Sequence, residues 1–120
     1  MSEVRMPLVL SQVIHDCGTG SKTAEYLLRI PLELAWFEGH FPEAPVLPGV
    51  VQIDWVMHFI KDLKLVGEFS GVSRMKFMRL IQPDAQLKLS LSATVDSTSV
   101  SYRFYDDNGS YASGNILLKL

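Results

Sequence analysis

The segment that follows Pro48 and Gly49, VVQIDWVMHFIKDLKL, limits the possible folds more than any other part of the sequence. It is long enough for a helix, and Gly67 just beyond it predicts where that helix stops. Its apolar residues fall on nearly every side of a helical wheel: Val50, Val51, Ile53, Trp55, Val56, Met57, Phe59, Ile60 and Leu63. A helix that is apolar all round must be buried on all sides. We therefore expect other elements to enclose it.

Alternating apolar and polar residues predict strands in the second half of the chain. Residues 87–95 alternate with the period of a half-buried strand, and so do Val100, Tyr102 and Phe104. The sequence Asp-Asp-Asn-Gly at 106–109 predicts a tight turn, after which residues 111–120 return as the second strand of a hairpin.

Shorter strand patterns occur at residues 23–30 and 71–80, whereas residues 8–14 fit either a short strand or a helix. Together with the long apolar helix, these segments predict the α+β class. The expected architecture is an antiparallel sheet of about five or six strands wrapped around one long central helix.

The composition indicates one folded domain over residues 1–120. Hydrophobic residues make up 48% of the chain and charged residues 20%, which suits a packed core. The 11 Lys and Arg against 13 Asp and Glu give a net charge of −2, which disfavours nucleic acid as a partner. The single cysteine, Cys17, excludes an internal disulfide. No stretch has the pattern of a secretory signal or a transmembrane helix, so we expect no membrane insertion and a cytoplasmic location.

The segment at residues 36–55, WFEGHFPEAPVLPGVVQIDW, combines several features of a catalytic site. Its three prolines limit the shapes of the loop, so His40 would be held in place as a base. Gly49 has no Cβ to block a ligand, and its N–H at the positive end of the helix can donate to an oxygen on which charge develops. Asp54 falls in the first two turns of the helix, where a buried carboxylate is costly and a functional role is favoured.

The motif GHFPxxPVxPG, with an acidic residue five positions after its last glycine, resembles the 3-hydroxyacyl-[acyl-carrier-protein] dehydratases of the hotdog fold. The likeness extends to residues 71–89, GVSRMKFMRLIQPDAQLKL, and covers roughly residues 5–120. The sequence of residues 36–55 is most similar to that of the dehydratases of aryl-polyene gene clusters. Three positions differ from the commoner pattern: Asp54 replaces Glu, His58 replaces Gln, and Asp84-Ala85 replaces Gly-Asp.

This resemblance implies dehydration of a 3-hydroxyacyl thioester on acyl carrier protein to the trans-2-enoyl thioester, in fatty-acid-like or aryl-polyene biosynthesis. His40 corresponds to the catalytic histidine that removes the α-proton, Asp54 to the acid that protonates the departing water, and Gly49 to the amide donor for the thioester oxygen. In the family the histidine and the acid come from different protomers, which implies a homodimer or a dimer-based higher oligomer. No metal or organic cofactor is implied, because the substrate is carried on the phosphopantetheine of the carrier protein.

Two further groups of residues are candidates for binding. The acyl chain would contact large apolar side chains before, in and after the motif, namely Trp36, Phe41, Val50, Phe59 and Phe77. An acidic carrier protein, or its phosphopantetheine phosphate, could dock on Arg74, Lys76 and Arg79, which share a stretch without acidic residues. For both groups the alternative is a purely structural role, in the core or on a solvated strand face.

Other hypotheses stay open at this point. Asp54 and His58, at positions i and i+4 of the helix, can form an ordinary structural contact. His40 with these two residues could instead form a metal site of two histidines and one carboxylate, which no second motif supports. The alternative functions are an acyl-thioester hydrolase of the same fold and a catalytically silent acyl-binding module.

Overall fold

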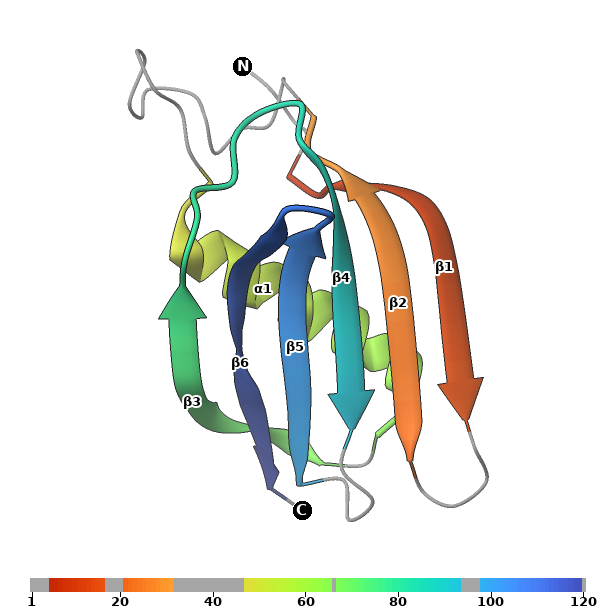
Figure 1. Cartoon of the computed structure of the whole chain (residues 1–120). Helices are drawn as coiled ribbons and strands as arrows, with labels where there is room; N and C mark the ends of the chain where they lie inside the picture. Colours follow the sequence, from red (N-terminus) through yellow and green to blue (C-terminus); the bar gives the residue numbers. More distant parts are fainter. Residues whose placement is uncertain (1–4, 17–20, 32–46, 66, 94–97, 120) are drawn as a thin grey trace.

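The computed structural model describes residues 5–16, 21–31, 47–65, 67–93 and 98–119. Within these residues, six antiparallel strands form one sheet in the order β1-β2-β4-β5-β6-β3, and helix α1 lies across one face of it (Figure 1). The strands are β1 (Leu8–Asp16), β2 (Lys22–Arg29), β3 (Glu68–Phe77), β4 (Gln86–Ala93), β5 (Ser99–Asp106) and β6 (Gly109–Lys119). Helix α1 spans Gly49–Ile60 and continues into a single 3₁₀ turn, η2 (Lys61–Leu63). The predicted α+β class, with a sheet wrapped around a central helix, is confirmed.

The predicted C-terminal hairpin is confirmed, with its turn at the predicted residues. β5 and β6 pair from Ser99 opposite Leu117 to Asp106 opposite Gly109, and Gly109 has a φ of 126°. Only a residue without a Cβ adopts that conformation at little cost, so the glycine fixes the place of the turn. The segment that fitted either a strand or a helix is a strand, β1, because its backbone pairs with β2 along its whole length.

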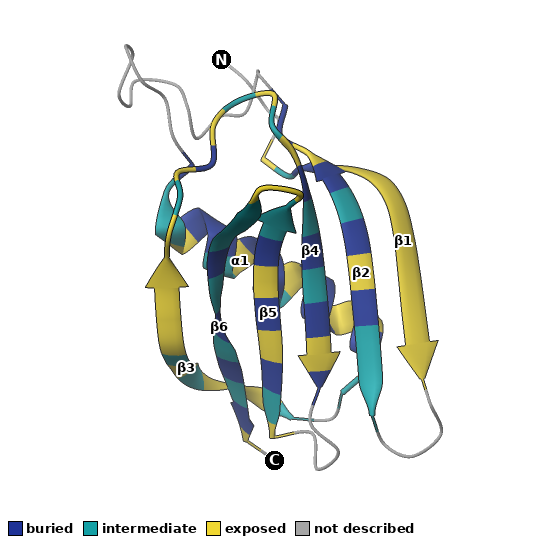
Figure 2. Ribbon diagram, viewed as in Figure 1, coloured by how far each residue is buried: buried dark blue, intermediate teal, exposed yellow. Residues whose placement is uncertain are grey.

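Alternation along the central strands divides the sheet into an inner and an outer face. β4, β5 and β6 bury every second side chain, as the banded colours of Figure 2 show. The inner side chains pack against α1 in one core, whose largest fully buried members include Trp55, Tyr26, Phe104, Leu28 and Ile116. Burial of a large apolar side chain stabilises the fold by roughly 1.5–3 kcal/mol, so this face holds most of the stabilising contacts.

The helix is buried on one side only, which corrects the expectation that it is enclosed all round. Val51, Trp55 and Phe59 face the sheet and are buried. Val50 is 77% exposed, and Asp54, four residues on, is exposed as well. The sheet has one concave face and therefore covers one side of a helix, which leaves a row of positions uncovered in the single chain.

The helix also ends earlier than its sequence pattern predicts. Lys64 takes the left-handed conformation with a φ of 54°, and its N–H donates to the Lys61 carbonyl at 3.1 Å. Gly67, the predicted stop, lies beyond this point and packs closely on β6, where an added Cβ would lie 3.0 Å from Leu118 Cβ. Gly67 thus allows close packing against β6, and Lys64 is the residue at which the helix ends.

A buried tyrosine anchors the end of the helix to β2. The Tyr26 hydroxyl donates to Asp62 Oδ2 at 2.7 Å and lies 3.4 Å from the Phe59 carbonyl oxygen. The rings of Tyr26 and Phe59 pack with centroids 4.5 Å apart. Burial, together with the bond to Asp62, raises the pKa of Tyr26, so it remains a neutral donor.

Candidate active site

The start of α1 carries Gly49, whose N–H is the predicted donor to the thioester oxygen. Pro48 precedes the helix in an extended conformation, and no side chain of the described residues caps the first turn. The N–H groups of Val51 and Gln52 donate to the Pro48 carbonyl at 3.1 and 3.2 Å, whereas no described residue accepts from the Gly49 N–H. The first N–H groups of a helix carry partial positive charge. This donor is therefore available to an oxygen that gains negative charge.

The ring of Phe77, at the end of β3, lies directly over Gly49. A Cβ at residue 49 would come within 2.9 Å of Phe77 Cζ and 3.0 Å of Cε1. Real Cβ atoms essentially never approach so closely, so glycine is what allows this ring to sit there. The structure thus brings together two residues that the sequence assigned separately, one to catalysis and one to the acyl chain.

Asp54 lies on the uncovered side of α1, which corrects the expectation that this acid is buried. Among the described residues, no hydrogen bond or ion pair joins Asp54 to His58, so the structural i,i+4 contact finds no support. Val50 shares the same exposed side. An acid in this place is open to a ligand or to a second chain.

Three of the predicted site residues, Trp36, His40 and Phe41, lie outside the described residues. Their placement beside Gly49 and Asp54 therefore stays a prediction. Phe59, another candidate for the acyl chain, is buried against Tyr26 near the other end of the helix. Ten residues of α-helix span about 15 Å, so Phe59 lies about that far along the helix from Gly49, and its contact with an acyl chain stays a prediction.

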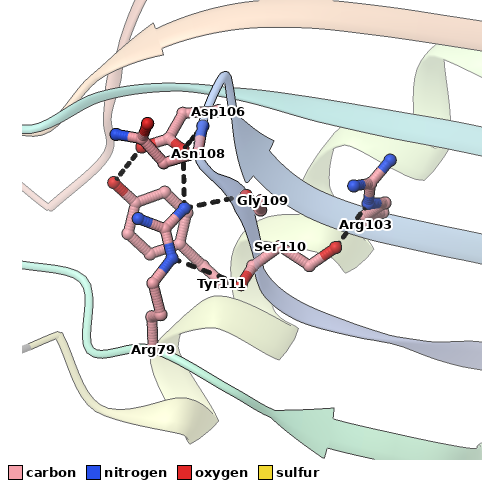
Figure 3. A network of polar contacts seen from close by, with 7 residues as sticks. All are labelled: Arg79, Arg103, Asp106, Asn108, Gly109, Ser110 and Tyr111. Atoms are coloured by element: carbon pink, nitrogen blue, oxygen red, sulfur yellow. Dashed lines mark hydrogen bonds and ion pairs between the residues drawn. The ribbon is translucent and has the colours of Figure 1, made fainter.

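Arg79 is held within the chain by several contacts at the tip of the β5–β6 hairpin (Figure 3). Its Nη2 donates to Asp106 Oδ1 at 2.6 Å and to the Gly109 carbonyl at 2.7 Å. The guanidinium carbon lies 3.8 Å from the centre of the Tyr111 ring, and the Tyr111 hydroxyl donates to Asp106 Oδ2 at 2.6 Å. The hydrogen bonds from Arg79 and Tyr111 lower the pKa of Asp106 to about 2.

Arg74 and Lys76, predicted with Arg79 to dock a carrier, have more accessible side chains. Both are exposed residues of β3, and Arg74 has a φ of 53° at the irregularity between Ser73 and Lys76. They line a shallow groove of about 510 Å³ on the outer face, to which Arg103 of β5 contributes a third cationic side chain. Sequence reasoning missed Arg103, because it stands alone in an alternating strand and joins the others only through the order of the strands.

Gln52 is a further residue that the sequence argument did not select. It is 4% exposed, and its Nε2 donates to the Leu47 carbonyl at 3.3 Å, while its Oε1 has no partner among the described residues. Leu47 in turn donates its N–H to the Ile81 carbonyl at 2.8 Å. The sequence signal that could have identified Gln52 is a polar residue within an apolar helical turn. In the structure its side chain holds the segment that leads into the helix.

The remaining features of the described residues do not coincide with this site. A hollow of about 600 Å³ lies on the outer face over β1, β2 and β4, with His15, Glu25 and Lys88 among its lining residues. No group of three or more His, Cys, Asp or Glu side chains that could hold a metal ion occurs in the described part of the chain, and His40 is not in that part. No helix within it is long and apolar enough to cross a bilayer.

Comparison with known proteins finds dehydratases among the proteins to which this chain is similar. The family model for ApeI-like proteins, described as ApeI dehydratase, matches residues 16–115. The 3-hydroxyacyl-[acyl-carrier-protein] dehydratase FabZ of Clostridium novyi is 30% identical over 95 residues, which cover 72% of this chain and 66% of that protein. The FabZ of Erythrobacter litoralis is 28% identical over 110 residues, which cover 83% of this chain and 72% of that protein. The chain thus spans about two thirds of the length of the first of these relatives.

Two solved structures share the fold over nearly the whole chain. An uncharacterised protein from Erwinia carotovora subsp. atroseptica superposes with a TM-score of 0.82 at 31% identity, covering 95% of this chain and 96% of that one. A chain of the dehydratase heterocomplex ApeI:P from Xenorhabdus doucetiae superposes with a TM-score of 0.80 at 31% identity, covering 95% and 98%. The expected hotdog architecture is confirmed by these likenesses.

Proposed function

The chain belongs to the ApeI-like dehydratase family, and from this premise we propose that it removes water from a 3-hydroxyacyl thioester to give the trans-2-enoyl thioester. The substrate is attached to an acyl carrier protein through phosphopantetheine, and the product belongs to fatty-acid-like or aryl-polyene biosynthesis. FabZ relatives named as 3-hydroxyacyl-[acyl-carrier-protein] dehydratases support this assignment. The reaction needs two proton transfers and no metal or organic cofactor.

In this mechanism each transfer is assigned to one residue. His40 takes the proton from the α-carbon, and the electron pair of that bond moves toward the thioester carbonyl. The Gly49 N–H donates to the oxygen on which charge develops, a contribution of about 3 kcal/mol in comparable oxyanion sites. Asp54 gives a proton to the 3-hydroxyl as its bond to carbon breaks, so that water departs and the double bond forms.

One observation carries the proposal: the start of α1 combines the Gly49 N–H, which has no acceptor among the described residues, with an exposed carboxylate at Asp54. Five residues of helix separate the two by about 7.5 Å along the axis. This span suits a substrate whose carbonyl oxygen lies at the helix start while its 3-hydroxyl reaches further along the helix. Phe77 over Gly49 supplies an apolar wall for the acyl chain.

A second hotdog chain completes the site in this proposal. The exposed side of α1 carries Val50 and Asp54, and the neighbouring edge strand β3 leaves Phe69, Val72 and Phe77 partly exposed. An unpaired edge with apolar side chains suits pairing with another strand. A homodimer joined there would cover Asp54 and bring in the histidine of the other copy. The Xenorhabdus doucetiae relative is part of a heterocomplex, so a second, related chain is an alternative occupant.

The carrier protein docks, in the same proposal, on the cationic side chains predicted for it, with Arg74 and Lys76 of β3 in the more accessible positions. Acidic surfaces and phosphates are attracted to such a cluster. Charge reversal at both residues should raise the KM for carrier-bound substrate and leave the KM for a small thioester unchanged. Equal effects on both substrates would contradict docking at this place.

Turnover of a panel of 3-hydroxyacyl carriers, read by mass spectrometry of the attached chain, tests the reaction itself. We expect reversible loss of one water from at least one chain, and a loss of activity of about 100-fold or more in His40→Ala and Asp54→Asn. His15→Ala and Asp107→Asn are matched controls that should keep full activity. Release of free thiol without enoyl product would instead identify a hydrolase, and binding without turnover would identify a silent acyl-binding module.

A further inference from the structure

We propose that Arg79 is a positioning residue of this site, which acts through Phe77 to set the apolar wall over Gly49 and so selects the acyl chain. The inference rests on the proposed dehydration. It assigns to Arg79 a role different from carrier docking, and it links the tip of the β5–β6 hairpin to the start of α1.

The first step is the strength of the attachment at Arg79. Its guanidinium donates to a carboxylate and to the Gly109 carbonyl, both within 2.7 Å, and it stacks on the Tyr111 ring at 3.8 Å. Asp106 is fixed in turn, because Tyr111 and the Asn108 N–H also donate to its carboxylate at 2.6 and 2.8 Å. Charge-assisted bonds of this length are the stronger class, and a closed network orients all its members.

The second step is that the main chain beside Arg79 is fixed at the same point. The N–H groups of Met78 and Arg79 both donate to the Tyr111 carbonyl, at 2.8 and 3.1 Å. The side-chain network and these backbone bonds therefore hold residues 78–79 against β6. Figure 3 shows Arg79 reaching from the segment that follows β3 to the hairpin, with Tyr111 and Asp106 around its guanidinium.

The third step concerns the strand that carries Phe77. Regular pairing of β3 with β6 is interrupted between Ser73 and Lys76, and it resumes for Lys76 and Phe77 alone. Phe77 pairs with Ala112, an inner-face residue, yet its side chain stays 51% exposed. Two ladder positions beyond an irregularity hold a strand end weakly. The contacts of residues 78–79 therefore determine where the Phe77 ring lies.

The last step is the contact between Phe77 and the helix start. The ring leaves no room for a Cβ at residue 49, so a small shift of the end of β3 changes the space above the Gly49 donor. Misplacement of a substrate by about 1 Å can cost 100-fold in rate. Loss of the Arg79 network is thus expected to alter which acyl chains react, although Arg79 itself touches no reacting atom.

The experiment compares Arg79→Met and Asp106→Asn with wild type on small 3-hydroxyacyl N-acetylcysteamine thioesters of short and long chains, and on one carrier-bound 3-hydroxyacyl substrate. Both variants should lower kcat and change the ratio of kcat/KM between long and short chains by about 10-fold. Arg79→Lys should recover part of that ratio, because an ammonium can still donate to Asp106. The matched control is Arg29→Met. Arg29 belongs to β2, four places from β3 in the strand order, and pairs with Asp84 at 2.6 Å, so its replacement should leave the ratio unchanged.

Two outcomes would overturn the inference: an unchanged chain-length ratio in folded Arg79→Met, or a KM increase confined to carrier-bound substrate, as docking predicts. Folding is checked by urea unfolding, and Asp106→Asn gives a second route if Arg79→Met does not fold. Fluorine NMR of protein labelled with fluorophenylalanine, with the Phe77 signal assigned by Phe77→Leu, is independent of turnover. Its signal should move in Arg79→Met and not in Arg29→Met, even if wild type proves to have no dehydratase activity.

Discussion

Gly49 and Phe77 form a contact in which the size of one residue fixes the position of the other. In Gly49→Ala the new Cβ would meet the tip of the Phe77 ring at 2.9 Å and displace it. Because alanine favours the helix by about 1 kcal/mol over glycine, we expect the free energy of unfolding to change by less than about 1 kcal/mol. The value of kcat/KM should nevertheless fall by about 10-fold or more, since the backbone N–H remains but its surroundings change.

Urea unfolding and steady-state turnover of the same preparation separate these two effects. The double variant Gly49→Ala with Phe77→Val relieves the crowding and serves as the control. Full activity of Gly49→Ala on every chain length would show that the ring and the donor do not act together.

Asp84 occupies a backbone conformation that most residues avoid. Its φ is 65°, at the position where the resembled family has glycine, and its carboxylate accepts two bonds from Arg29 at 2.6 and 3.0 Å. Both side chains are about half exposed, so the ion pair itself contributes little. We expect Asp84→Asn to change the free energy of unfolding by less than about 0.5 kcal/mol, whereas Asp84→Val should lower it by about 1–2 kcal/mol.

Chemical denaturation of these two variants measures the difference directly. If Asp84→Asn proves as unstable as Asp84→Val, the ion pair matters more than the backbone conformation.

At the scale of elements, the network between residues 78–79 and the β5–β6 hairpin should respond to acid. Hydrogen bonds from Arg79 and Tyr111 lower the pKa of Asp106 from 3.8 to about 2. A lowered folded-state pKa stabilises the fold at pH values above about 4, and this stabilisation is lost as the pH falls toward 2. Near neutral pH, wild type should therefore unfold at a higher urea concentration than Asp106→Asn. The two urea midpoints should converge near pH 2. A difference that persists unchanged at the lowest pH would contradict this role of the carboxylate.

The sequence was sufficient to predict those elements whose pattern is local. Alternation in residues 87–95 and 100–104 and the turn at 106–109 predicted β4, β5 and the hairpin correctly over the described residues. Residues 8–14 stayed ambiguous because only pairing with β2, a contact along another strand, makes them β1. The exposure of Asp54 depends on which side of α1 meets the sheet, and a helix that is apolar all round does not encode that side. The different roles of Arg79 and Arg74 could not be predicted either, because the contacts that hold Arg79 come from residues 106–111, distant in the sequence.

At the scale of the whole molecule, the exposed side of α1 and the edge strand β3 predict association through β3. Val72 lies on the inner side of this strand, opposite Ile116, and is 37% exposed. A lysine on an edge strand opposes pairing with another edge. We expect Val72→Lys to convert the wild-type oligomer to single chains in light scattering and to abolish turnover with it. Ser92→Lys, on the exposed outer face of β4, is the control that should keep both the mass and the activity.

That prediction fails if wild type is already a single chain in solution and remains fully active. A composite site formed from two chains would then be excluded, and Asp54 would have to work with groups of its own chain.

The opposite edge of the sheet has a different consequence. Every residue of β1 is exposed, and five of its nine side chains are large and apolar, namely Leu8, Val9, Leu10, Val13 and Ile14. Two chains joined through β3 would carry such an edge at each end, and open edges of this kind template further growth into aggregates. The irregularity between Val9 and Ser11 interrupts the flat hydrogen-bonding surface. The tendency to aggregate at high concentration should therefore depend on β1, which lies at the opposite edge of the sheet from β3.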